Sequence, residues 1–228
     1  MPDESFDKKQ ILTLIKGAKH IGIVPSKMSL ADSLSAAAGL YFMILEELDK
    51  EELRKEERKT VSLVFDEEIP ESCTNVLNKL DVTSKISERE LQVTIDYAGS
   101  GADAFRWTND KQLLTVFLGQ VEKDFDRNRI KSAVLGFDFD IVFTIGMQGF
   151  DDIEQMYATI NKEVKRSRIV NLDNTSLNTR FGFVNIVDTS ADTLSLLVLQ
   201  KAVEWGLKPN TKSAKALLNG ITSLPVAK

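Results

Sequence analysis

A chain of 228 residues, of which 43% are hydrophobic, is long enough for one large α/β domain or two small ones. Its net charge of −5 at pH 7 excludes an overall basic field of the kind that favours nucleic acid. The single cysteine, Cys73, excludes a disulfide framework and a zinc site built on thiolates, so we expect a reducing, cytoplasmic compartment.

The first part of the chain has the pattern of a β-α-β unit. Its polar start lacks the apolar core of a signal peptide, and no apolar run approaches the ~18 residues of a membrane span, so we expect no membrane contact. An amphipathic helix is expected over residues 7–19 and a short strand over 20–24. A helix over 30–48, with Ser29 at its N-cap, leads to a strand at 61–65 that should pair in parallel with the first.

Residues 86–122 have a different pattern. Apolar and polar residues alternate over 91–97, and a second apolar run follows at 113–121. These two runs predict a β-hairpin inserted at the edge of the sheet, with a long tip between its strands. Phe105 and Trp107 fall on this tip, where they either form an exposed aromatic patch or fold back onto the core.

The last part of the chain returns to alternating strands and helices. A strand at 140–145 ends at Gly146, and a second strand is expected at 168–172. Helices are expected over 151–165, 191–205 and 212–218. We therefore predict a single α/β domain over residues 1–228, with a mainly parallel sheet of about five strands and helices on both faces. Its centre should consist of the strands at 20–24, 61–65, 140–145 and 168–172.

The stretch from Ser167 to Asp188 organises the rest of the chain. It reads S-R-I-V-N-L-D-N-T-S-L-N-T-R-F-G-F-V-N-I-V-D. An apolar strand ends at Asp173, and a glycine turn and a second extended piece precede the next helix. Open α/β sheets build their binding sites at the carboxyl ends of strands in this way.

This stretch resembles the DHH phosphoesterase superfamily, in particular its RecJ-like oligoribonuclease/pAp-phosphatase branch. In that family a strand ends in Asp-His-His, followed by Asn, an aromatic-Gly pair, another Asn, and Val-Asp before a helix. The same frame stands here at Asp173, Asn178, Phe181-Gly182, Asn185 and Val187-Asp188. Asn174 and Thr175 occupy the positions of the two histidines, so the chain keeps the frame without those ligands.

The resemblance implies two divalent cations, with Mn²⁺ suited to oxygen and imidazole ligands, held by loops at four strand ends. Three of those loops supply no ligand here. Gly22, Ser26 and Met28 stand at the ligand positions of the first loop, Gly146 stands at that of the second, and residues 220–224 contain no acid. Only Asp173 remains, and one carboxylate does not hold two hard cations, so we expect no metal cofactor. The alternative is a rearranged Mn²⁺ site.

We expect a metal-free crevice at the carboxyl ends of the strands. Its candidate residues are Ser26, Ser29, Asp32, Gly146, Asp173, Asn174, Thr175 and Asn178. Asp173 either keeps a ligand role or binds a backbone amide or a loop hydroxyl. Asp32 either faces the crevice or serves the dipole of its own helix.

Other polar residues fit structural roles better than ligand roles. His20, the one histidine, stands at the amino end of its strand and should face the opposite edge of the sheet. Four acids have the positions of helix caps: Asp151, Asp152, Asp188 and Asp192.

Two functions are consistent with this pattern. The first is a pseudoenzyme that keeps the DHH-like scaffold for binding or assembly. The second is a Mn²⁺-dependent phosphoesterase acting on nucleotides or short oligonucleotides through rearranged ligands. The family usually adds a C-terminal substrate-binding domain, and this chain stops before it. We therefore expect a homo-oligomer, formed either through the segment 217–226 or through the tip that carries Phe105 and Trp107.

Overall fold

The computed structural model describes residues 8–50, 59–65, 67–77, 80, 82–83, 90–119, 121, 125–135, 139–156 and 167–223. The chain forms two compact units. The first comprises Met1–Glu88 and Phe137–Lys228, and the second comprises Arg89–Gly136. In the described part of the chain, no helix has the combination of length and apolar character that crossing a membrane requires.

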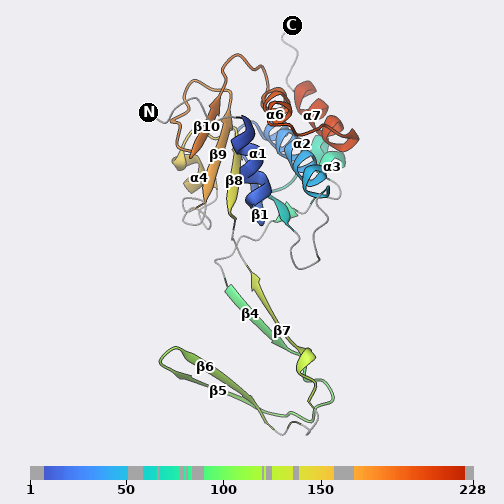
Figure 1. The fold of residues 1–228 in the computed structure, drawn as a ribbon, viewed down its shortest axis with the longest axis vertical. Helices are drawn as coiled ribbons and strands as arrows, with labels where there is room; N and C mark the ends of the chain where they lie inside the picture. The colour runs from blue at the N-terminus through green and yellow to red at the C-terminus, as the bar shows by residue number, and fades with distance from the viewer. Residues whose placement is uncertain are drawn as a thin grey trace. The chain divides into compact units, whose positions relative to one another are not determined.

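A six-stranded sheet forms the centre of the first unit, and every pair of neighbouring strands in it is parallel (Figure 1). The strand order is β10-β9-β8-β1-β2-β3. The strands are β1 (His20–Pro25), β2 (Thr60–Val64), β3 (Val82–Thr83), β8 (Ile141–Ile145), β9 (Arg168–Asp173) and β10 (Val184–Val187). The four strands predicted for the centre are the contiguous block β2-β1-β8-β9, which confirms the α/β class with a mainly parallel sheet.

Helices alternate with these strands along the chain. They are α1 (Lys8–Gly17), α2 (Leu30–Leu48), α3 (Glu71–Leu77), α4 (Phe150–Met156), α6 (Leu194–Glu204) and α7 (Thr211–Thr222). Residues 157–165 of the helix predicted over 151–165 lie outside the described residues. Gly206, with a φ of +93°, follows the C-terminal end of α6, and a capping box between Asn210 and Ser213 begins α7.

The cap predicted for α2 is wrong in one respect. Ser29 occupies the N-cap position, but its side chain makes no capping hydrogen bond. Its backbone, at φ −110° and ψ 60°, is not in the extended conformation that directs a serine hydroxyl toward the first amides of a helix. The Ser33 hydroxyl instead donates to the Ser26 carbonyl at 2.5 Å, which ties the first turn of α2 to the end of β1.

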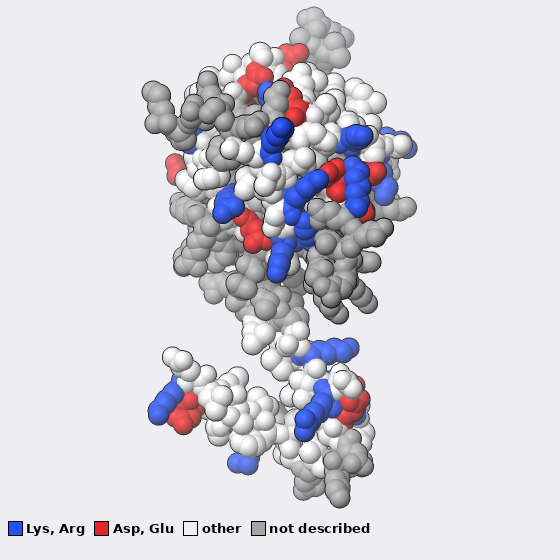
Figure 2. All heavy atoms as spheres, viewed as in Figure 1, with Lys and Arg blue, Asp and Glu red and all other residues white. Residues whose placement is uncertain are grey.

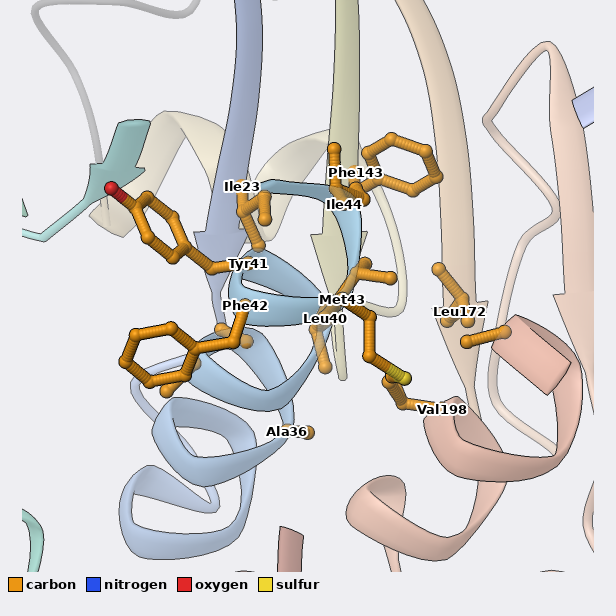
Figure 3. Packing of buried hydrophobic residues seen from close by; sticks show 14 of the residues in the cluster. Ile23, Ala36, Leu40, Tyr41, Phe42, Met43, Ile44, Phe143, Leu172 and Val198 are labelled. Carbon is orange, nitrogen blue, oxygen red and sulfur yellow. The ribbon is translucent and has the colours of Figure 1, made fainter. Parts of the chain in front are cut away.

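Apolar side chains cover both faces of the sheet, as predicted. On one face, Ile23 and Phe143 pack against residues of α2 and α6, including Met43 and Val198 (Figure 3). A methyl group on Gly39 of α2 would lie 2.5 Å from Leu217 of α7, so these two helices approach closely. On the other face, α4 contributes Ile153 to a smaller cluster with Val24, Val64, Val142, Met147 and Ile169.

The second unit contains two antiparallel strand pairs. They join β4 (Glu90–Ile95) to β7 (Ile130–Leu135) and β5 (Phe105–Asp110) to β6 (Leu113–Leu118). An inserted hairpin is therefore present, but the predicted pairing of 91–97 with 113–121 is wrong. The segment expected to be a tip forms β5, which returns through Lys111 and Gln112 to pair with β6. Local alternation predicts strands but does not determine their partners.

Candidate functional site

Asp173 lies at the carboxyl end of β9, and its side chain is fully buried. One carboxylate oxygen accepts a hydrogen bond from the backbone amide of Asn174 at 2.9 Å. The other accepts from the Thr175 hydroxyl and from Asn178 Nδ2, both at 2.8 Å. Three uncharged donors of one loop thus surround the carboxylate. Asp173 thus binds a backbone amide and a loop hydroxyl, which was the alternative to a ligand role in the sequence analysis.

Asn178 extends this network into the sheet. Its Nδ2 also donates to the Met147 carbonyl at 2.8 Å, and its Oδ1 accepts from Asn171 Nδ2 at 3.1 Å. Asn171 Oδ1 accepts in turn from the Thr144 hydroxyl at 2.9 Å. Thr144 and Asn171 are fully buried and stand opposite each other in β8 and β9. Sequence reasoning missed this pair, although a polar residue inside each of two apolar strands is a visible signal.

Asn174 ties the same loop to the approach to α6. Its Nδ2 donates to the Ala191 carbonyl at 3.0 Å. Asp188 closes a turn rather than capping the helix, because its carboxylate accepts from the Ser190 hydroxyl and the Ser190 amide. These two hydrogen bonds lower the pKa of Asp188. The cap of α6 is Thr193, since the helix begins at Leu194, later than predicted; Asp192 does not serve as that cap.

Of the two acids predicted to cap the helix after β8, Asp152 has that role. It is the third residue of α4, and its carboxylate accepts from the amides of Gln148 at 2.6 Å and Gly149 at 3.3 Å. In one half of a capping box, the side chain at the third helical position accepts a hydrogen bond from the N-cap amide in the same way. Asp151 is exposed on the same turn.

An apolar side chain lies beside the residue that follows β8. Gly146 follows β8 with a φ of +75°, in the left-handed region that glycine adopts most easily. A methyl group there would lie 2.6 Å from Leu194 Cδ1 and 3.4 Å from Ser26 Cβ. Leu194 therefore fills the space beside Gly146. Ser26 is fully buried, and its hydroxyl accepts from the Met28 amide at 3.1 Å, whereas Ser29 is exposed.

Asp32 binds the N-terminus of a different helix from its own. Its buried carboxylate accepts from the amides of Leu194 at 2.7 Å and Ser195 at 3.0 Å, and from the Ser195 hydroxyl at 2.7 Å. The first amides of a helix have no partner inside the helix and carry the positive end of its dipole, which explains this pairing. Asp32 thus adds a second cap to α6 beside its N-cap residue Thr193, rather than bonding to its own helix α2, and this corrects the role expected from its position in the sequence.

His20 lies at the opposite edge of the sheet, as expected. Its Nδ1 is 2.8 Å from the Thr60 hydroxyl, where β1 and β2 begin. The adjacent carboxylate of Asp140 accepts from the amides of Lys19 at 2.7 Å and His20 at 3.0 Å. Burial raises the pKa of Asp140, but the two amide hydrogen bonds together with the positive charges of His20 and Lys19 outweigh that effect, so the pKa is lowered.

The described residues do not fit the two-cation centre that the family resemblance implies. Among them, no group of three or more His, Cys, Asp or Glu side chains lies close enough together to hold a metal ion. The two buried carboxylates of this region, Asp32 and Asp173, each accept hydrogen bonds from three uncharged donors. Divalent cations such as Mn²⁺ require several oxygen or imidazole ligands around each ion.

Comparison with known proteins supports the fold. No protein-family model matches the sequence, and no curated protein matches it. The chain is similar to the crystal structure of an exopolyphosphatase-related protein from Bacteroides fragilis, with a TM-score of 0.61 and 12% sequence identity. The match covers 95% of this chain and 49% of that one, so this chain spans about half the length of the solved protein. At this identity, the likeness establishes a shared fold.

Proposed function

We propose that this chain is a DHH-phosphoesterase-like protein that has lost metal-dependent catalysis and uses its scaffold for binding or assembly. The observation that carries the proposal is the environment of Asp173. It is the one acid retained from the family's ligand pattern, and it is fully buried with both oxygens bonded to its own loop. The frame from Asp173 to Asp188 favours the RecJ-like branch, and the shared fold with an exopolyphosphatase-related protein is consistent with it.

Energetics favour this assignment over a catalytic one. To ligate a cation, Asp173 would have to release the Thr175 hydroxyl or the Asn178 amide. A fully buried donor left without an acceptor costs about 1–3 kcal/mol, and these two half-buried donors would lose up to that amount. Leu194 packs beside Gly146, where the resemblance implies a second carboxylate, so an apolar side chain stands where a ligand is needed.

A calorimetric titration with Mn²⁺, combined with an assay on a generic phosphodiester, tests the proposal. We expect no micromolar Mn²⁺ binding and no Mn²⁺-stimulated hydrolysis. Asp173→Asn is the informative variant, and Asp192→Asn is its matched control, because Asp192 is an exposed acid of the same region. Micromolar binding that is lost in Asp173→Asn but kept in Asp192→Asn, together with hydrolysis, would establish the phosphoesterase with rearranged ligands instead.

A further inference from the structure

The β5–β6 hairpin of the second unit has one face without charged residues. Strands in antiparallel register place directly paired residues on the same side of the ribbon. Phe105 pairs with Leu118, Trp107 with Val116, and Asn109 with Leu114. These six residues form what we term the hairpin face. The opposite side carries the charged residues Arg106 and Asp110 together with Leu113 and Phe117. The Arg106 guanidinium lies 4.3 Å from the centre of the Phe117 ring.

The hairpin face is largely exposed. Phe105 is 75% exposed, Leu114 65%, Trp107 62% and Val116 49%. An isolated two-stranded ribbon is marginally stable in water and gains stability when further structure covers an apolar face. A contiguous apolar surface of this kind also marks an interaction site in soluble proteins. The face is therefore a candidate interaction surface.

We propose that the occupant is the hairpin face of a second copy of this chain, packed face to face in a two-fold dimer. Two aromatic side chains that bury about 150–250 Å² each, and the aliphatic residues beside them, give the face on the order of 500 Å² of coverable surface. A stable interface buries about 800 Å² per partner, so this face supplies more than half of that area. Two sheets that pack in this way lie ~10 Å apart.

Charge favours a second copy over a nucleic acid. The segment 89–136 contains seven Lys or Arg and seven Asp or Glu residues, so its net charge is zero. Binding to a phosphate backbone needs an excess of cations, which this unit lacks. A neutral apolar face, in contrast, meets its own copy without like-charge repulsion. In Figure 2, most atoms along the hairpin are white, so they belong to residues other than Lys, Arg, Asp and Glu.

The other surface considered for association receives less support. Leu218 is 60% exposed on α7, but Leu217 is buried, and residues 224–226 lie outside the described residues. The inference about the hairpin face does not rest on the loss of catalysis. A Mn²⁺-binding enzyme can dimerise through this face, and a metal-free protein can be monomeric, so the two proposals fail in different experiments.

Light scattering on the whole chain at micromolar concentration is the first test. We expect a mass near twice the monomer mass of 25.5 kDa. Trp107→Glu places a charge at the centre of the hairpin face and should weaken self-association at least roughly tenfold, as loss of a central tryptophan does in other interfaces. Thr108→Glu is the matched control, because it adds the same charge to the same strand on the opposite side.

The variants separate disruption of the face from disruption of the fold. Trp107→Phe should keep the dimer, and the thermal unfolding of the helical unit should be the same in all variants. If Trp107→Glu unfolds, Val116→Glu repeats the test, since Val116 pairs with Trp107 on the same face. A monomeric wild type contradicts the proposal, and so does a dimer that Trp107→Glu leaves intact or that Thr108→Glu disrupts equally.

Tryptophan fluorescence adds an independent readout. The chain has two tryptophans, and Trp205 is buried in the first unit with 5% exposure. In a Trp205→Phe background the emission reports Trp107 alone, and we expect it to shift to longer wavelength on dilution as the dimer dissociates. Blue-shifted emission at a concentration where the mass is that of a monomer would show that the face is covered within its own chain, and would overturn the proposal.

Discussion

Asn178 uses every hydrogen-bonding direction of its amide to fix the loop after β9. Its Nδ2 serves Asp173 and the Met147 carbonyl, while its Oδ1 accepts from Asn171 and from the backbone amide of Arg180. Arg180 has a φ of +54°, a conformation that costs a non-glycine residue about 1–2 kcal/mol. The bond to Asn178 helps to hold it there. The hydrogen bonds of Asn178 thus give this residue of the loop a structural role.

Asp173→Asn tests whether this hydrogen-bond network stabilises the loop after β9. The substitution keeps the size of the side chain but puts an amide group where an oxygen accepts hydrogen bonds. The Thr175 hydroxyl can reorient to accept, but Asn178 Nδ2 is committed to the Met147 carbonyl. We expect the free energy of unfolding to fall by about 1–3 kcal/mol in urea denaturation. Asp192→Asn, on an exposed acid, should change it by less than about 0.5 kcal/mol. Equal stability of the two variants would contradict the network.

At the scale of elements, Asp32 joins three helices. It lies in α2 and caps α6, and Gly220 of α7 packs directly over it. A side chain at position 220 would overlap Ser195 Oγ, so the glycine is required for the close approach. This contact holds the start of α6 so that Leu194 packs beside Gly146, at the end of β8. The cap is therefore part of what shapes the candidate site.

Removing this cap should weaken the whole helical layer. In Asp32→Ala, the amides of Leu194 and Ser195 lose their acceptor in a buried environment. We expect a loss of about 2–3 kcal/mol in the free energy of unfolding, measured by urea denaturation. Asp49→Ala is the control, because Asp49 is exposed at the C-terminal end of α2, where an acid gains nothing from the dipole. A small effect for Asp32→Ala, equal to that of Asp49→Ala, would contradict the role of Asp32.

Asp140 links the starts of β1 and β8 and gives stability a pH dependence. Its pKa is lowered from the ordinary value of 3.8, so the unfolded chain binds its proton more readily than the folded one. The stabilisation is therefore complete above about pH 4 and is lost as pH falls through the lower, folded value. Asp140→Asn should be less stable than the wild type at neutral pH, and the difference should shrink below about pH 4 in urea titrations at a series of pH values. A difference independent of pH would argue against the two amide hydrogen bonds.

Sequence patterns predicted those helices and strands well whose position depends only on the local order of apolar and polar residues. The strands at 20–24, 61–65, 140–145 and 168–172 are short apolar runs bounded by polar residues, and all four are central in the sheet. The errors concern contacts between distant residues. Asp32 meets residues about 160 positions away, and β4 pairs with β7 rather than with the next strand. The local pattern of apolar residues does not identify either partner, because residues so far apart in the sequence meet only in the folded chain.

For the candidate site, the order of strands and loops predicted that the residues after β9 lie together. It did not predict which side chains pack around them. Asp173, Asn174, Thr175 and Asn178 do form one cluster after β9. Asp173 as a residue type does not reveal whether its oxygens face a cation or three loop donors. Likewise Leu194 reads as an ordinary apolar residue of a helix, and its position beside Gly146 depends on the helix cap.

At the scale of the whole molecule, the two units differ in how they are stabilised. Among the described residues, every buried hydrophobic side chain belongs to the first unit, and the six-stranded sheet is built from that unit alone. The second unit consists of two strand pairs with exposed apolar side chains, such as Leu91 at 70% exposure. The first unit therefore contains the core required for independent folding, whereas the described side chains of the second unit form no such core.

Excision of the second unit tests this division. Replacing residues 89–136 with a short Gly-Ser linker removes no buried hydrophobic side chain among those described and leaves all six strands of the parallel sheet. The linker also shortens a connection within the first unit, which lowers the entropic cost of closing it, although only by about 0.6 kcal/mol for each halving of its length. We expect cooperative thermal unfolding with a midpoint within about 5 °C of the wild type, since 1 kcal/mol shifts the midpoint by only a few degrees in a domain of this size. The excised protein should also be monomeric in light scattering, because it lacks the hairpin face. Loss of cooperative unfolding would show that the first unit depends on the second, whereas a dimer that survives excision would place the association surface on the first unit.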